Sequence, residues 1–265
     1  MPRIFRFVTR SLYARGVIDS SHPVTKLANF RDLGNLAGQH GTIRPGVFFR
    51  SDDVSTIDDE EAERLVSHDI SLIIDLRSSD EVSGGRGPLA HYDIDYLNLP
   101  ILESSGTSQN LGELVSGAEF TNAMLGRWYF DVFHKAMPLL IDGLQAVSEA
   151  QGAVLFHCAI GKDRTGLFAV ALHGALGTHR AHIVADFEKT EVNLSKVLAR
   201  LTASQPFWTP EVISKAGALL RADAKAMHVF LDAIEAQGTD LEEMLVDGGA
   251  TVALLEDLRA LALTR

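Results

Sequence analysis

Residues 156–166, FHCAIGKDRTG, contain one cysteine and one arginine with five residues between them, and they lie between an apolar run and a second apolar stretch. The first run predicts a strand and the second a helix. At such a junction successive backbone N–H groups can curl around one anion, the helix N-terminus adds partial positive charge, and a guanidinium offers two parallel donors. The segment therefore predicts a phosphate cradle made of Ala159, Ile160, Gly161, Lys162 and Arg164.

Cys158 is the predicted nucleophile of this cradle. The same field favours its thiolate near neutral pH, and a thiolate can attack phosphorus in line to form a phosphocysteine that water then hydrolyses. Arg164 and the N–H groups would stabilise charge on the equatorial oxygens. A merely buried structural cysteine would not explain the crowding of glycine, lysine and arginine in one turn. A nucleotide-binding Walker loop is excluded because Asp163, rather than serine or threonine, follows Gly161-Lys162.

Neighbouring side chains have roles that the sequence leaves open. Thr165 could donate its hydroxyl to the thiolate or be an ordinary first-turn residue. His157 is expected to order the loop through a buried hydrogen bond. Arg31 and Arg77 are either phosphate ligands or partners in internal salt bridges.

The elements around the cradle alternate between strands and helices. Apolar segments at 47–50, 71–75, 94–99 and 153–157 predict strands, the last of the buried parallel type. Thr56 with Asp59 resembles a capping box for a helix ending near Ser67. Residues 120–147 have helical periodicity with an expected break at Pro138, and the chain beyond His179 is almost wholly helical in pattern. The prediction is an α/β fold with a small, mostly parallel sheet and a helical C-terminal region.

Composition limits the classes of function. The 265 residues are 46% hydrophobic and 22% charged, which is typical of a packed globular protein, and the net charge of -11 argues against nucleic acid as a partner. One cysteine cannot form an intramolecular disulfide, which fits a reducing compartment or a cysteine kept for chemistry. No apolar run is long enough to span a bilayer, so a cytoplasmic location is expected, without excluding secretion by another route.

Residues 1–22 form a basic leader, followed by one expected domain at residues 23–265. The leader carries four arginines and no acid in its first 18 residues, interleaved with apolar side chains. It could contact an anionic membrane weakly or act as a transit segment, although a loose terminus is the simpler interpretation.

The loop resembles the HCxxGKDRTG loop of bacterial tyrosine phosphatases, a family that includes a secreted mycobacterial phosphatase and related lipid-active enzymes. Four other segments carry the resemblance: residues 29–34, residues 44–51, residues 74–77 with Glu81, and residues 186–193. The resemblance implies the tyrosine-phosphatase fold, no metal or organic cofactor, and a phosphorylated protein or a phosphoinositide as substrate. It also places residues 120–147 where some members have a helical lid. The alternative is that the aromatic side chains of this segment simply pack in the core.

The family resemblance further implies that Asp163, inside the loop, is the general acid that protonates the leaving oxygen and later the base for water. Asp163 could instead be a solvated cap at the helix start. Asp75, Asp80 and Asp95 are rival acids, and Asp75 ends a predicted strand, where active-site loops of open α/β sheets gather. Lys162 would favour multiply charged substrates if it met a second phosphate, but could instead lie on a solvated rim.

Two other functions use a similar anion loop. A catalytically weak phosphate-binding module would not need a nucleophile, so the intact cysteine argues against it. A thiol-dependent arsenate reductase or sulfurtransferase would need an external thiol, because the chain has only one cysteine.

Overall fold

The computed structural model describes residues 23–102, 120–204 and 216–264. The expected leader at residues 1–22 lies outside these ranges. Among the described helices, none combines the length and the apolar content needed to cross a membrane.

The centre of the molecule is a five-stranded sheet in the order β1-β4-β7-β5-β6. Strands β4, β7, β5 and β6 are parallel, and the two-residue β1 closes one edge in antiparallel pairing with β4. Their carboxyl ends therefore meet at one edge, where Asp75, His157 and Asn98 lie at one level. The strands are β1 (Arg31–Asp32), β4 (Phe48–Ser51), β5 (Ile70–Asp75), β6 (Asp95–Asn98) and β7 (Ala153–His157).

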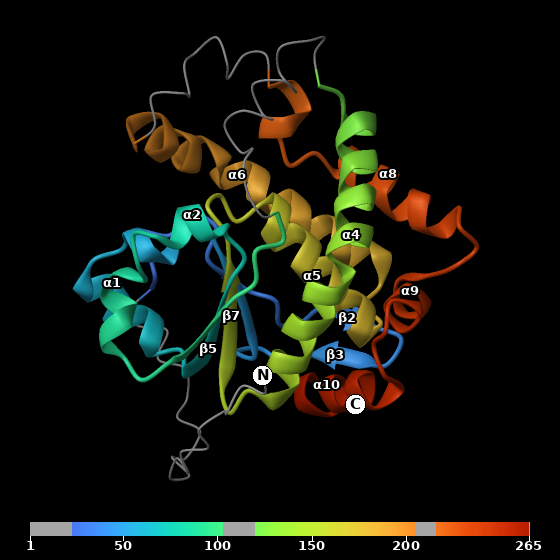
Figure 1. Cartoon of the computed structure of the whole chain (residues 1–265), viewed down its shortest axis with the longest axis horizontal. Helices are drawn as coiled ribbons and strands as arrows, with labels where there is room; N and C mark the ends of the chain where they lie inside the picture. The colour runs from blue at the N-terminus through green and yellow to red at the C-terminus, as the bar shows by residue number, and fades with distance from the viewer. Residues whose placement is uncertain (1–22, 103–119, 205–215, 265) are drawn as a thin grey trace.

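Helices cover both faces of this sheet (Figure 1). Leu72 and Ile74 of β5 belong to the larger hydrophobic core, which they share with α4 (Asn122–Glu149) and α5 (Asp163–Leu176). Ile73, which points to the opposite face, packs in a second core with Leu65 of α1 (Asp59–Val66). Because both faces are covered, β5 and β7 are buried along their whole length, as a continuous apolar strand predicts. The mostly parallel α/β sheet is thus confirmed.

Two local expectations were wrong. Pro138 does not break the helix, because α4 runs through it without interruption, and its neighbours Met137 and Leu140 are buried in the core. Tertiary packing here outweighs the loss of one backbone donor. The cap of α1 is Asp58 rather than Thr56: its side chain accepts from the N–H of Glu61 at 3.1 Å.

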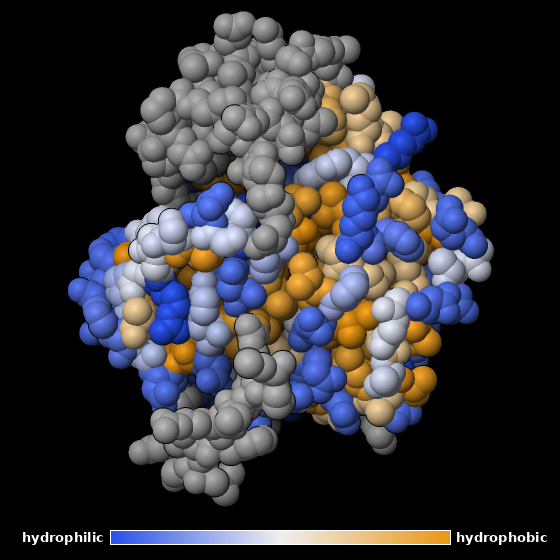
Figure 2. All heavy atoms as spheres, in the orientation of Figure 1, coloured by the Kyte–Doolittle hydropathy of each residue, from blue (hydrophilic) through white to orange (hydrophobic). Residues whose placement is uncertain are grey.

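The C-terminal region is helical, as expected, and packs on α4 and α5. Its elements are α6 (Arg180–Ser204), the 3₁₀ helix η3 (Gly217–Leu220), α8 (Ala224–Glu235), α9 (Leu241–Asp247) and α10 (Val252–Ala262). An unexpected short strand, β8 (Leu263–Thr264), pairs with β3 (Gly41–Ile43), which also pairs with β2 (Ala37–Gly38). On the face shown in Figure 2, hydrophobic atoms gather beside α4.

Candidate active site

The predicted cradle lies at the carboxyl edge of the sheet, between the end of β7 and the first residue of α5. Cys158 is 2% exposed, and the backbone N–H of Gly161 donates to its Sγ at 3.2 Å. Gly161 has φ of +74°, and a Cβ there would lie 2.6 Å from the carbonyl oxygen of Ser51. Only glycine fits this conformation and this approach, so the turn that directs an N–H at the thiol depends on it.

Two side chains from outside the loop hold its carbonyl groups. Nδ2 of Asn29 donates to the oxygen of Ile160 at 2.6 Å, and Nη2 of Arg50 donates to the oxygen of Gly161 at 2.9 Å. The C=O and N–H of one planar trans peptide point in opposite directions. Tying the Ile160 carbonyl outward therefore turns the N–H of Gly161 inward, toward the sulfur.

Arg50 is itself held by a buried ion-pair network. Asp186, 2% exposed, accepts from Nη1 of Arg50 at 2.5 Å and from Nε of Arg31 at 2.8 Å. Burial alone would raise the pKa of Asp186, but the charges of Arg50 and Arg31 hold it well below its ordinary value. Arg31 is therefore a salt-bridge partner that supports the cradle through Asp186 and Arg50.

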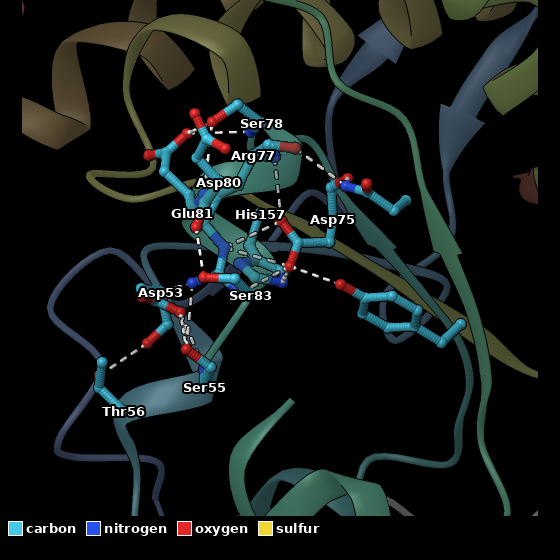
Figure 3. Close-up of polar contacts among 12 residues, drawn as sticks. Asp53, Ser55, Thr56, Asp75, Arg77, Ser78, Asp80, Glu81, Ser83 and His157 are labelled. Carbon is cyan, nitrogen blue, oxygen red and sulfur yellow. Dashed lines mark hydrogen bonds and ion pairs between the residues drawn. The ribbon is translucent and has the colours of Figure 1, made fainter. Parts of the chain in front are cut away.

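The guanidinium of Arg164 forms a two-pronged pair with Glu81. Nη2 donates to Oε1 at 2.9 Å, and Nη1 donates to Oε2. Glu81 also closes a capping box with Ser78 at the start of α2 (Ser79–Val82), accepting from the N–H of Ser78 at 2.9 Å (Figure 3). Arg164 is 7% exposed. The planar fork is thus oriented before any phosphate arrives, which lowers the entropy lost on binding.

Arg77 lies between two carboxylates (Figure 3). Its Nη2 donates to Oδ2 of Asp75 at 2.7 Å and its Nη1 to Oδ2 of Asp53 at 2.8 Å. The hydroxyl of Tyr96 also donates to Oδ2 of Asp75 at 2.8 Å. Arg77 is therefore a salt-bridge partner, and the buried Asp75 already accepts several donors. A catalytic role for Asp75 stays a prediction.

His157 is buried beside Asp75, and its Nε2 lies 3.5 Å from Oδ2 of that carboxylate. Burial lowers the pKa of His157, although the charge of Asp75 acts against this shift. The ordering of the loop by a hydrogen bond from His157 stays a prediction.

Asp163, the first residue of α5, has one carboxylate oxygen held by two donors. The hydroxyl of Tyr129 donates to Oδ1 at 2.6 Å, and Nζ of Lys162 lies 3.1 Å from the same oxygen. The side chain of Asp163 keeps 21% of its surface exposed. Its role as general acid stays a prediction, and an unpartnered solvated cap does not describe this environment.

Lys162 is buried, with only 1% of its surface exposed, so the alternative of a solvated rim position was wrong. Its Nζ donates to the carbonyl oxygens of Leu219 and, at 3.2 Å, of Arg221. The ammonium is therefore enclosed by backbone oxygens from the segment that follows α6. Contact with a second phosphate stays a prediction.

The remaining sequence candidates differ in their positions. Ala159 and Ile160 are partly exposed in the loop. The hydroxyl of Thr165 is buried with no hydrogen-bond partner among the described residues, so its donation to Cys158 stays a prediction. Asp95 pairs with Leu72, three residues before the carboxyl edge, which places it about 10 Å from the level of the cradle. Asp80 is exposed on α2. Within the described ranges, no group of three or more metal-ligating side chains is assembled.

Sequence reasoning assigned no role to five residues that the structure brings to the site. They hold the loop, orient the arginine or contact Asp163, and they are Asn29, Arg50, Glu81, Tyr129 and Asp186. All except Tyr129 belong to the segments that carried the family resemblance. The family resemblance could therefore have drawn attention to these four residues, but it did not reveal which group each side chain contacts.

Comparison with known proteins agrees with this geometry. Residues 22–264 match the model of the tyrosine phosphatase family. The chain belongs to this family. The match extends over nearly the whole chain and includes the predicted cradle.

Relatives support the same family. A protein of Cupriavidus necator named as a candidate tyrosine-protein phosphatase is 29% identical over 166 residues, which cover 61% of this chain and 59% of that one. The triple specificity protein phosphatase PtpB of Mycobacterium tuberculosis is 28% identical over 280 residues, covering 89% of this chain and 96% of that one. The chain therefore spans less than two thirds of the first relative and nearly all of the second.

A crystal structure of Pseudomonas aeruginosa TpbA with phosphotyrosine covers 80% of this chain and 91% of that one, at 15% identity and a TM-score of 0.36. This likeness is too distant to support an argument about fold or substrate. The fold assignment rests on the sheet order and on the family match.

Proposed function

We propose that the chain is a cysteine-dependent phosphatase that hydrolyses phosphotyrosine through a phosphocysteine intermediate. The observation that carries the proposal is the arrangement at Cys158. A buried thiol accepts an N–H from Gly161, at the start of a helix whose first turn carries a pre-oriented Arg164. Backbone donors and a guanidinium around a sulfur nucleophile form an anion site suited to phosphoryl transfer.

The reaction has two steps. The thiolate of Cys158 attacks phosphorus, the S–P bond forms, the bond to the phenolic oxygen breaks, and that oxygen takes a proton from Asp163. Water then attacks the phosphocysteine, gives a proton to the carboxylate of Asp163, and the S–P bond breaks to restore the thiolate. The sum is hydrolysis of one phosphomonoester by one water molecule, and the acid returns to its starting state.

Phosphotyrosine is the substrate class we propose. Cys158 is 2% exposed, and a long aromatic ester can carry its phosphate to a buried nucleophile. Phosphoinositide hydrolysis, implied by the sequence resemblance, has no additional support from the described contacts, because Nζ of Lys162 contacts backbone carbonyls and Asp163. A cytoplasmic location and membrane contact through residues 1–22 also stay predictions.

Release of phosphate from phosphotyrosine peptides, phosphoserine peptides and phosphoinositide vesicles tests the proposal. We expect turnover of phosphotyrosine, and less than a few per cent of it in Cys158→Ser, because a serine hydroxyl does not ionise at neutral pH. Acid quenching during turnover, followed by mass spectrometry, should recover phosphate on Cys158 of the wild type. Iodoacetate provides a control, because the chain has one cysteine and one carboxymethyl group should abolish activity.

Phosphate binding without turnover would instead indicate a binding module. Reduction of arsenate that depends on an added thiol, with no ester hydrolysis, would indicate a reductase. Loss of turnover on adding a chelator would contradict a metal-independent mechanism.

A further inference from the structure

Two donors from different parts of the fold converge on one oxygen of Asp163. Tyr129 comes from α4, and Lys162 is the residue immediately before α5. The hydroxyl of Tyr129 lies 2.6 Å from Oδ1, and Nζ of Lys162 lies 3.1 Å from it. Among the described residues, no hydrogen bond to Oδ2 accompanies them, and 21% of the side chain remains exposed. The two carboxylate oxygens therefore have different environments.

We propose that Tyr129 and Lys162 are positioning residues that hold Oδ1 of Asp163, so that Oδ2 exchanges the proton with the leaving group and then with water. The inference rests on the proposed function and adds two residues to it. A general acid must be held within hydrogen-bond reach of the leaving oxygen, and a carboxylate fixed through one oxygen cannot rotate away.

Tyr129 is built to act as a rigid neutral donor. Its side chain is 1% exposed, and its ring makes edge contacts with Phe187 at 5.8 Å and Phe230 at 6.2 Å between centroids. Burial, with the nearby charge of Asp163 as a second cause, raises the pKa of Tyr129 well above its ordinary value. The phenol therefore keeps its proton over the whole working range of pH.

Lys162 is held by three oxygen atoms. Its Nζ donates to the carbonyl oxygens of Leu219 and Arg221 and forms an ion pair with Oδ1 of Asp163. Lys162 thus connects the segment that includes η3 to the catalytic loop and places a positive charge beside the acid.

Tyr129→Phe tests the proposal with two leaving groups. Phenyl phosphate needs protonation of its leaving oxygen, and p-nitrophenyl phosphate, with an acidic phenol, needs much less. We expect kcat to fall about tenfold or more for phenyl phosphate and less than about threefold for p-nitrophenyl phosphate, with KM little changed. Equal losses for both esters would mean that Tyr129 is structural, and would overturn the proposal.

Tyr96→Phe is the matched comparison, because it removes a tyrosine hydroxyl bonded to another aspartate, Asp75, at 2.8 Å. We expect any loss in this variant to be the same for both esters. A leaving-group-dependent loss in Tyr96→Phe and not in Tyr129→Phe would make Asp75 the acid. The phosphocysteine would still be trapped in either case, so failure here is distinguishable from failure of the proposed function.

Lys162→Met tests the second donor with two substrates. The loss of kcat/KM should be equal, within about a factor of two, for a phosphotyrosine peptide and a phosphoinositide, since the ammonium acts on Asp163 in both reactions. It should again be larger for phenyl phosphate than for p-nitrophenyl phosphate. A loss confined to phosphoinositide would overturn the positioning role and make Lys162 a substrate contact. Circular dichroism and thermal melting confirm that each variant is folded.

Discussion

Arg50 reaches the catalytic loop from β4 and donates to the carbonyl oxygen of Gly161 at 2.9 Å, while its other terminal nitrogen binds Asp186 at 2.5 Å. One side chain thereby joins the first parallel strand, α6 and the cradle. Both Arg50 and Asp186 are almost fully buried. The shape of the cradle is therefore coupled to a buried ion pair outside the loop.

Arg50→Met should destabilise the fold and weaken catalysis together. Removing one partner of a buried ion pair leaves the other charge uncompensated. The remaining contact of Asp186 with Arg31 reduces this cost, so we expect a loss of about 3 kcal/mol in the free energy of unfolding. Urea unfolding measures this free energy. Arg180→Met is the control, because its partners Asp232 and Glu235 are exposed and the loss should be below about 1 kcal/mol. Similar stabilities for the two variants would contradict the coupling.

Arg164→Lys should be folded but nearly inactive. An ammonium cannot reproduce the planar fork that binds two equatorial oxygens, and removal of one such donor typically costs about a hundredfold or more in rate. Lysine can still pair with Glu81, so the melting temperature should change little. The measurements are kcat/KM for a phosphotyrosine peptide and the Kd for inorganic phosphate. Retention of more than about a tenth of the wild-type kcat/KM would show that a positive charge at this position is sufficient for catalysis without the planar fork.

The buried His173 predicts a loss of stability in mild acid. Burial lowers the pKa of His173 to about 4, below its ordinary value of 6.5, so the unfolded chain binds the proton more tightly than the folded protein does. This contribution to stability is complete above pH 6.5 and declines as the pH falls toward 4, by a total on the order of 3 kcal/mol. Urea unfolding at several pH values measures the slope.

His173→Gln should flatten this pH dependence between pH 6.5 and 4, whatever the variant's absolute stability. Carboxylates with a lowered pKa, such as Asp186, also make the free energy of unfolding depend on pH, but at lower pH. They are present in both proteins. The difference between the two slopes therefore isolates the histidine. Parallel slopes would show that His173 does not titrate on unfolding in this window.

Much of the central sheet was predictable from local pattern. The strand at 153–157 was predicted with its exact bounds, and β4 and β5 to within one residue, because buried parallel strands are short continuous apolar runs. The spacing of Cys158 and Arg164 marked the cradle for a similar reason: an anion loop between a strand and a helix uses consecutive backbone groups, so its chemistry is encoded in one short segment.

The break expected at Pro138 and the cap expected at Thr56 show where local pattern is insufficient. A proline removes one donor and strains a helix, but the burial of residues on either side of it in α4 outweighs that cost. The two-residue β8 could not be foreseen either, since it exists only through pairing with β3, more than two hundred residues earlier.

The sequence by itself predicted the nucleophile and the phosphate clamp, and it correctly gave the class of sheet that presents them, since each depends on neighbours within a few residues. Only the tertiary structure decided which side chains surround them. Arg50 and Asn29 donate hydrogen bonds to the loop carbonyls. Glu81 pairs with Arg164, and Tyr129 donates to Asp163. These contacts join residues 34 to 131 positions apart. Residue type and local periodicity carry no information on such pairings, because they arise from the packing of helices and strands that the chain brings together only when folded.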